Sequence, residues 1–210
     1  MQLVLDIGDG QLHVGGMEVA AAALAELVLL GRVGSVPETG FMSRKGKHKL
    51  VVLSADPVGA PALDGALVAM MSMGTKPRDA FGILPKVWKP VASAVQEALI
   101  ERGVIRREGR FGGLRSSLWI VDGAQQRDAI FRLNAAWLTP EAVSDIRDAV
   151  FVDLMRNADD RFNRGAQRPH GVENAPVIER DWYPPEICDA LIEIFAAERA
   201  TAGPGAGYES

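Results

Sequence analysis

The residues best suited to chemistry in this chain lie in a short run near its middle, at positions 110–115. Two apolar side chains, Phe111 and Leu114, lie between two arginines, Arg110 and Arg115, with a pair of glycines that suits a tight turn. Such a tip can bring its apolar side chains to the boundary between lipid headgroups and acyl chains while the guanidinium groups meet lipid phosphates. The run therefore predicts a membrane-insertion tip, with an ordinary surface turn around one packed phenylalanine as the alternative.

The residue types of known catalytic and metal sites occur without the spacing that such sites need. His13, His48 and His170 lie in three unrelated contexts, and no pair has the i, i+4 spacing of two ligands on one helix face. The glycines at positions 8 and 10 do not continue into a dinucleotide-binding fingerprint, and neither a nucleophile elbow nor a Walker phosphate loop occurs. We therefore expect a non-catalytic protein without a metal or an organic cofactor.

The charge balance limits the kinds of partner. With 23 basic and 27 acidic side chains the formal net charge is -4, which argues against a protein whose entire surface grips nucleic acid or anionic lipid. Two local basic clusters remain, residues 44–49 and the arginines at positions 102, 106, 107, 110 and 115. Five aspartates are interpreted as the solvated face of one helix rather than as a metal site. They are Asp145, Asp148, Asp153, Asp159 and Asp160.

Cysteine usage and hydropathy indicate the compartment. The single cysteine, Cys188, excludes an internal disulfide and a cysteine-based zinc site, and it fits a reducing environment. The longest apolar run, residues 19–30, is interrupted by Glu26 and is far shorter than the roughly 20 residues that span a bilayer. No signal-peptide pattern opens the chain. We expect a cytoplasmic protein whose membrane contact is peripheral, on the cytoplasmic membrane face.

Apolar periodicity predicts the elements of the N-terminal half. Met17–Leu30 is apolar on nearly every face and is expected to be a central helix that ends at Gly31 in a left-handed cap. Residues 34–49 are expected to form a surface loop, Leu50–Leu53 a short strand, and Pro61 the first turn of a helix. The inward face of that helix is predicted to carry Leu63, Leu67, Met70 and Met71.

The helix before the tip has the cleanest pattern in the chain. It is predicted to start at Pro90, to place apolar residues at i, i+3, i+4, i+7 and i+8, and to end at Gly103. An earlier helical segment at 76–88 must bend or be divided at Pro85, because proline removes a helical hydrogen bond. The helix and the tip should therefore be neighbours in space.

The remaining elements complete the predicted architecture. From Val104 the period becomes that of strands, so Val104–Arg107 and Leu114–Val121 are expected to pair as a hairpin. Further elements are a short hairpin within residues 2–14, helices at 122–137, from 139 and after 185, and a linker at 165–176. The fold class is mainly α, a single-domain helical bundle over residues 1–200 with a projecting β-hairpin and a few short strands. A disordered tail is expected at 201–210.

Two other functions remain open for the helix and hairpin at 91–121. A helix followed by an arginine-bearing hairpin is also the layout of a winged-helix nucleic-acid reader. The exposed residues of its helix would be Ser93, Gln96 and Glu97, without the basic side chains of a recognition helix, so the pattern does not favour nucleic acid. The third hypothesis is a scaffold that self-associates through its hairpin.

Three segments in one order resemble the Golgi phosphoprotein 3 family. They are a helix closing on Leu30-Gly31-Arg32, a strand running into Asp56-Pro57-Val58-Gly59 before Ala62-Leu63-Asp64-Gly65-Ala66-Leu67, and a helix ending Leu99-Ile100-Glu101-Arg102-Gly103-Val104-Ile105. The resemblance covers roughly residues 17–160. It implies a mainly α-helical domain with a projecting β-hairpin, and a peripheral adaptor of the kind that reads phosphatidylinositol 4-phosphate.

The resemblance also implies where a lipid headgroup would bind. Counting along the family pattern places its tryptophan near Gln11 to His13, its first arginine near Ala20, and its two later arginines at Lys89 and Ala92. Lys86, one turn before Lys89, would face the same headgroups. Because bidentate guanidinium groups are missing, we expect binding of anionic phospholipid rather than of phosphatidylinositol 4-phosphate specifically. A client protein and further copies of the chain are the other expected partners.

Overall fold

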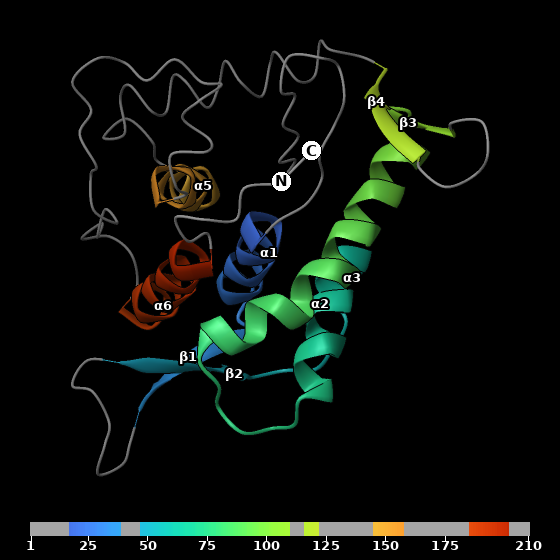
Figure 1. The fold of residues 1–210 in the computed structure, drawn as a ribbon. Coiled ribbons are helices and arrows are strands. Elements are labelled where there is room, and N and C mark those ends of the chain that lie inside the picture. The colour runs from blue at the N-terminus through green and yellow to red at the C-terminus, as the bar shows by residue number, and fades with distance from the viewer. Residues whose placement is uncertain (1–16, 39–46, 110–115, 122–144, 158–184, 202–210) are drawn as a thin grey trace, which may run out of the picture.

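The computed structural model describes residues 17–38, 47–109, 116–121, 145–157 and 185–201. Its helices are α1 (Met17–Leu29), α2 (Pro61–Ser72), α3 (Ala80–Glu101), α5 (Ile146–Asn157) and α6 (Pro185–Thr201). Its strands β1 (Val33–Pro37) and β2 (His48–Val52) form one antiparallel pair, and β3 (Ile105–Gly109) and β4 (Ser116–Ile120) form another. The described chain is mainly helical with a β-hairpin at one end of α3, which confirms the predicted fold class (Figure 1).

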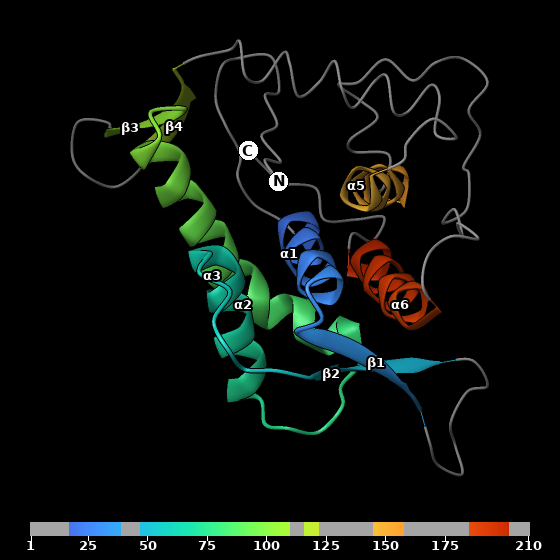
Figure 2. The ribbon, with the colours of Figure 1, turned by 180° about the vertical axis from the view of Figure 1, so that it is seen from behind.

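α1 lies at the centre of the described bundle, between α3 and α6 (Figures 1 and 2). Nine of its 13 residues are buried, and most of these are alanines, whose small side chains let α2, α3, α5 and α6 approach it closely. Gly31, with a φ of 65°, donates to the Val28 carbonyl at 3.0 Å, and the N–H of Arg32 donates to the Leu27 carbonyl at 2.9 Å. The predicted central helix and its glycine cap are confirmed.

The first strand pair corrects the predicted surface loop at residues 34–37 and 48–49, while residues 39–46 of that prediction lie outside the described residues. β1 and β2 pair antiparallel, with Val33 opposite Val52 and Val36 opposite Lys49. Glycine, serine and proline interrupt the apolar alternation of β1, so its sequence gives only a weak strand signal. Val33 is 1% exposed, and its burial ties the strand to the core.

α3 is one continuous helix through Pro85 and Pro90, so the predicted helix start at Pro90 is wrong. The helix begins at Ala80, where Asp79 caps it by accepting a hydrogen bond from the N–H of Gly82 at 2.7 Å. A proline inside a helix costs about 3 kcal/mol. Apolar packing against α1 and α2 outweighs this cost, and the helix bends instead of ending, as predicted for Pro85 (Figure 1).

β3 and β4 form the predicted hairpin at the C-terminal end of α3. The helix gives way at Gly103, which has a φ of 67°, and β3 follows almost directly. Leu99, Val104 and Ile105 form a small buried cluster against which Leu118 of β4 packs. This cluster holds the hairpin on the helix end, from which it projects away from the rest of the bundle (Figures 1 and 2).

The last two helices confirm part of the predicted pattern. The predicted helix after residue 185 is confirmed as α6, along which Leu191, Ile194 and Phe195 are buried. α5 begins at Ile146, and its predicted start at residue 139 lies outside the described residues. The same holds for the predicted elements at 2–14, 122–137 and 165–176 and for the tail from residue 202.

Two side-chain predictions are wrong. Met71 is 47% exposed, because Leu67 and Met70 occupy the buried face of α2. Asp153 is 0% exposed although it was expected on a solvated face, since it follows the buried Ala149 by one helical turn. Asp145 and Asp148 are exposed as predicted, while the aspartates at 159 and 160 lie outside the described residues.

Polar contacts hold the loop between β2 and α2. Arg32 donates to Ser54 Oγ at 3.0 Å, and Ser54 Oγ donates to an Asp56 carboxylate oxygen at 2.8 Å. Asp64, in the first turn of α2, accepts a hydrogen bond from the N–H of Val58 at 2.7 Å. These contacts join the end of α1 to the start of α2. Gly31-Arg32, Asp56 and Asp64, which belong to the family-like motifs of the sequence, therefore have a structural role here.

The central position of α1 predicts a large effect of Leu24→Ala. This substitution should lower the free energy of unfolding by about 2 to 5 kcal/mol, because it leaves a cavity in the core. Urea unfolding followed by circular dichroism measures the loss. Val68→Ala, at a side chain that is 67% exposed on α2, is the control and should change stability by less than about 0.5 kcal/mol. Equal losses would contradict the burial of α1.

The Asp64 contact predicts a difference between two substitutions at one position. Asp64→Ala should lower the free energy of unfolding by about 1 to 2 kcal/mol, because the N–H of Val58 loses a charged acceptor. Asp64→Asn keeps an acceptor oxygen and should lose less than half as much in the same unfolding experiment. Equal losses in the two variants would assign the effect to the charge of Asp64 near the helix N-terminus instead.

Candidate functional site

The structure places two of the predicted headgroup residues. Lys86 and Lys89 lie on α3, and both are exposed. The third, His13, lies outside the described residues, as does the whole predicted insertion tip. The tip residues are Arg110, Phe111, Leu114 and Arg115. The site is therefore built from α3 and from the strands that carry the tip.

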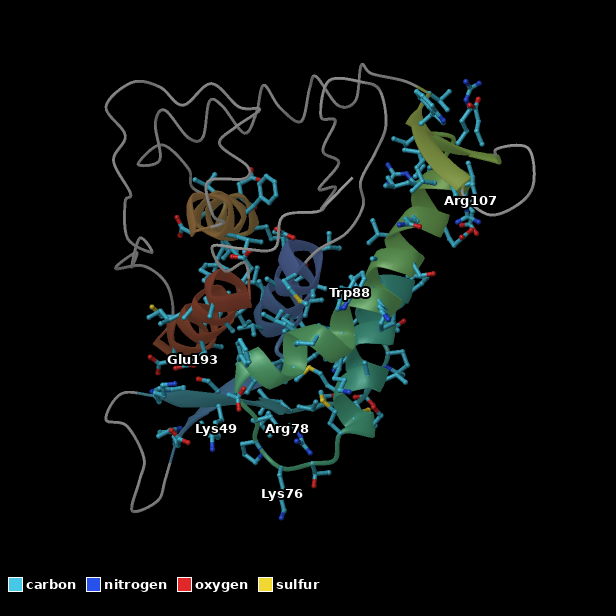
Figure 3. The ribbon with its side chains drawn as sticks, in the orientation of Figure 1. Lys49, Lys76, Arg78, Trp88, Arg107 and Glu193 are labelled. Carbon is cyan, nitrogen blue, oxygen red and sulfur yellow. The ribbon has the colours of Figure 1, made fainter. Side chains whose placement is uncertain are left out.

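The two lysines present their charges without an acidic partner. Neither Lys86 nor Lys89 forms an ion pair with another residue of the described ranges. Lys89 Nζ lies 5.6 Å from the centre of the Trp88 ring, a cation–π contact that contributes about 0.5 to 1 kcal/mol at an exposed site. Trp88 packs partly buried against the core (Figure 3). The ring thus orients Lys89 and leaves its charge available.

An exposed stripe of α3 connects the lysines to the hairpin. Lys86, Ser93 and Glu97 are all exposed, and they share one side of the helix because their separations correspond to about two and three helical turns. Glu97 Oε1 accepts a hydrogen bond from Arg107 Nη2 of β3 at 2.8 Å. The stripe therefore begins at the predicted headgroup lysines and ends at the base of the hairpin.

The hairpin has two unlike faces because side chains alternate along a strand. Ile105 and Arg107 lie on the face toward α3. Arg106 and Glu108 lie on the outer face, where Arg106 pairs in register with Trp119 of β4. Trp119 is only partly buried. The outer face thus combines a guanidinium group with an aromatic ring whose polar edge and apolar body suit a membrane interface.

Trp119 is a candidate site residue that the sequence analysis did not single out. The signal that could have found it is strand alternation, which separates it from the inward Leu118 and puts it opposite Arg106. The structure extends the candidate surface from the tip to the outer face of the strands.

Both arginines of β3 are held by weak ion pairs. Arg106 Nη2 lies 2.7 Å from Glu108 Oε1, and Arg107 Nη2 lies 2.8 Å from Glu97 Oε1. All four side chains are roughly half exposed, and ion pairs of this kind contribute about 0 to 1 kcal/mol. A lipid phosphate can therefore replace a glutamate at little cost. At the hairpin base, an anion would therefore compete with glutamates for the two arginines, and these four side chains form no preformed anion pocket.

Two cations away from this surface have raised pKa values. The pKa of Lys49 is raised chiefly by a hydrogen bond to Glu38, with Nζ and Oε1 2.8 Å apart. The pKa of Arg147 is raised chiefly by a hydrogen bond to Glu26 of α1, also at 2.8 Å. A raised cation pKa adds stability that is fully present below the ordinary pKa and is lost as the pH rises through the raised one. Both contacts therefore persist at neutral pH, where they support the fold.

The positions that the family resemblance assigns to arginine are packed in this chain. Ala20 of α1 is 0% exposed and Ala92 of α3 is 4% exposed. α1 and α3 contact each other, so these alanines lie within a bundle where a phosphate would lose its water without gaining a donor from them. Of that set, Lys89 alone supplies a cation. The geometry of a bidentate phosphate site is absent from these described positions.

Other chemistries find little support within the described ranges. No group of three or more His, Cys, Asp or Glu side chains there could hold a metal ion. Among the helices that the structure describes, none has the length and apolar character required to cross a bilayer. The site consists of exposed cations, two exchangeable ion pairs and a partly buried tryptophan around a projecting hairpin.

Comparisons with known proteins agree with this architecture. A search of curated proteins gives no match. The family model described as Golgi phosphoprotein 3 (GPP34) matches residues 3–193. The match includes both strand pairs, α1, α2, α3, α5 and about the first half of α6. The central α1 and the hairpin at the end of α3 thus lie within one continuous match. On this evidence the chain belongs to the Golgi phosphoprotein 3 family.

Proposed function

We propose that this protein is a non-catalytic adaptor that binds anionic phospholipid membranes peripherally, on their cytoplasmic face. The observation that carries the proposal is the exposed stripe of α3, which leads from Lys86 and Lys89 to the base of a projecting hairpin. Family membership supports the same class of protein. In the proposal the lysines, together with His13, attract headgroups, and the hairpin tip enters the membrane boundary. The tip residues are Arg110, Phe111, Leu114 and Arg115.

The proposed recognition depends on charge and insertion rather than on one headgroup. Ala20 and Ala92 supply no donors where the family resemblance places arginines, and Lys89 offers a single flexible charge. A phosphomonoester-specific site needs several convergent donors. We therefore infer that the protein distinguishes anionic from neutral membranes and discriminates only weakly among anionic lipids.

Attachment through this surface is weak for one molecule. A basic residue near an anionic membrane contributes about 1 kcal/mol, and each buried apolar tip side chain contributes at most about 1.5 to 3 kcal/mol. Lost translational and rotational freedom opposes these gains. Stable residence therefore requires several linked copies or a membrane-anchored client protein, since a second attachment raises the local concentration. Self-association and client binding thus belong to the proposal.

The acidic part of the stripe disfavours the nucleic-acid alternative. Glu97 and Glu101 are exposed on the C-terminal half of α3, the part next to the hairpin that a winged-helix protein would bring to DNA. Carboxylates at that position repel the phosphate backbone.

The lysines predict a charge-dependent loss of membrane binding. The double substitution Lys86→Ala and Lys89→Ala should weaken binding to phosphatidylserine-containing vesicles by about 30-fold, the equivalent of about 1 kcal/mol for each lysine. Vesicle co-sedimentation measures the loss. Lys47→Ala with Lys76→Ala is the matched control, because these exposed lysines lie outside the stripe. A comparable loss in both double variants would reject a specific role of α3.

The hairpin tip predicts an insertion contribution that salt does not remove. The double substitution Phe111→Ala and Leu114→Ala should weaken vesicle binding at least about tenfold at high ionic strength, where apolar contacts persist and charge is screened. Phe81→Ala is the control, since Phe81 is 56% exposed on the first turn of α3. Equal recovery of wild type and the double variant with the vesicles would remove the tip from the proposal.

A further inference from the structure

One ion pair joins the exposed stripe of α3 to the hairpin. Glu97 Oε1 of α3 accepts a hydrogen bond from Arg107 Nη2 of β3 at 2.8 Å, across ten positions of the chain. The side chains are 54% exposed for Glu97 and 46% exposed for Arg107. Figure 3 shows Arg107 where the hairpin meets the end of α3. This arginine of the hairpin is therefore occupied by an acid of the protein itself.

The attachment of the hairpin does not depend on this ion pair. Leu99, Val104 and Ile105 form a buried apolar cluster against which Leu118 packs, and this cluster holds the hairpin on the helix. An ion pair between half-exposed side chains adds little stability, because solvent screens it and both side chains lose rotamer freedom. Its larger effect is on the charge that the hairpin presents, since it neutralises an arginine that remains open to solvent.

The cations of the candidate membrane surface are thus of two kinds. Lys86 and Lys89 are exposed and form no ion pair within the described ranges, so an anion can approach them directly. Arg107 presents its full charge to a phosphate only when its contact with Glu97 is broken. The effective concentration of Glu97 is fixed by the fold, whereas that of lipid phosphate rises with the charge density of the membrane. A densely charged membrane can therefore displace the glutamate where a weakly charged one cannot.

We infer that Glu97 determines how much anionic charge a membrane must carry before Arg107 binds it. On a weakly charged membrane Glu97 keeps Arg107, and the lysines of α3 alone attract the headgroups. On a strongly charged membrane a lipid phosphate takes the place of the carboxylate, and the hairpin base adds its contact to that of the lysines. Glu97 acts in this way only on a protein that binds membranes, so the inference rests on the proposed function and adds to it a residue that sets selectivity.

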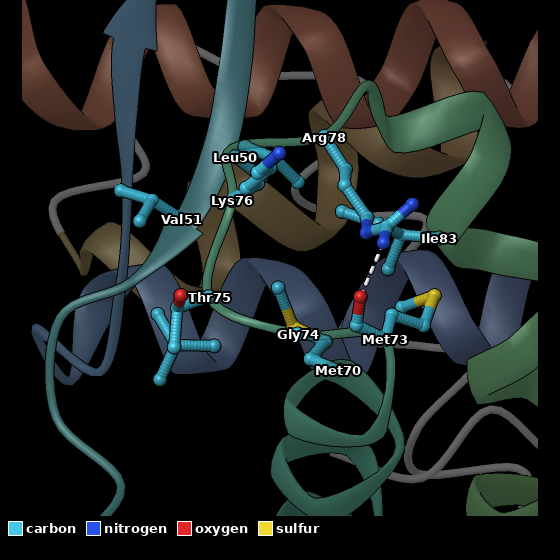
Figure 4. A pocket seen from close by; sticks show the side chains of 10 residues that line it. Leu50, Val51, Met70, Met73, Gly74, Thr75, Lys76, Arg78 and Ile83 are labelled. Atoms are coloured by element: carbon cyan, nitrogen blue, oxygen red, sulfur yellow. Dashed lines mark hydrogen bonds between the residues drawn. The ribbon is translucent and has the colours of Figure 1, made fainter.

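Arg78, at the other end of the molecule, is an arginine without a competing carboxylate. Its Nη2 donates to the backbone carbonyl of Met73 (Figure 4), and none of the ion pairs of the described ranges includes it. The apolar side chains beside it, Met70 and Ile83, are packed, at 4% and 1% exposed. An anion there meets only an exposed guanidinium group. Arg78 is therefore a reference for the release of Arg107.

The first test follows the binding of inorganic phosphate at the arginine side chains by NMR of the isotope-labelled full-length protein. Glu97→Gln removes the charge and keeps the size of the side chain. The Arg107 guanidinium signal should then respond at a phosphate concentration at least about threefold lower than in wild type, within the range set by an exposed ion pair. The Arg78 signal should respond equally in both proteins. Equal responses of Arg107 would overturn the role of Glu97.

The second test is a double-mutant cycle in the binding of vesicles of phosphatidylserine and phosphatidylcholine. Glu97→Gln should tighten binding, and the gain should be at least about threefold larger with Arg107 present than in the Arg107→Gln background, because only Arg107 can be released. Wild type should also need a higher fraction of phosphatidylserine than Glu97→Gln for half-maximal binding. Adding Arg107→Gln to both proteins should reduce that difference.

Glu101→Gln is the matched control for the vesicle cycle. Glu101 is exposed one helical turn after Glu97, and it forms no ion pair with another residue that the structure describes. Its substitution changes the net charge by the same amount, so its gain should be the same with Arg107 and in the Arg107→Gln background. Equal gains of Glu97→Gln in the two backgrounds would show a general effect of charge and overturn the inference.

The two tests distinguish this inference from the proposed function. Vesicle binding by wild type with equal gains in the cycle would leave the membrane function intact and remove the special role of Glu97. A lowered phosphate concentration at Arg107 without vesicle binding by any variant would overturn the membrane function. Control of Arg107 by Glu97 would then concern a soluble phosphate compound instead of a lipid.

Discussion

The close packing of helices around α1 is the constraint on which the rest of the structure depends. Its alanines contribute little apolar area themselves, so cohesion comes from the larger side chains of neighbouring helices, such as Leu84, Leu191 and Phe195, which are fully buried. A larger residue in α1 would force those helices apart. The same packing holds α3 through its two prolines, and α3 in turn carries both the lysine stripe and the hairpin.

The elements that the sequence predicts well are those in which local pattern and tertiary packing agree. The uniformly apolar helix α1, the helix after residue 185 and the change of period near Gly103 are all confirmed in the structure. The wrong predictions concern segments whose secondary structure is determined by tertiary contacts rather than by local sequence. β1 exists because Val33 is buried and β2 lies beside it, and α3 continues through Pro90 because its neighbours hold it, which no local rule expresses.

For the candidate site, residue types were easier to predict than their arrangement. Lys86 and Lys89 are exposed as expected, since their spacing keeps both off the buried face of α3. The position of the hairpin at the end of that face depends on the buried cluster of Leu99, Val104 and Ile105 and on the bend of the helix, which are three-dimensional facts. Trp119 was missed for a similar reason. Its place beside a cation became visible only when the strand pairing put it opposite Arg106.

The small apolar cluster at the end of α3 gives the hairpin a core that is largely separate from the core of the bundle. Leu99, Val104 and Ile105 form a core of their own, and Val95 is a partly buried residue that borders both this cluster and the main one. Fluctuations that open β3 and β4 can therefore leave the bundle folded. For the same reason, substitutions in the hairpin should have little effect on the stability of the helical bundle. Substitutions on the outer face of the hairpin can therefore change its chemistry while the helical bundle stays folded.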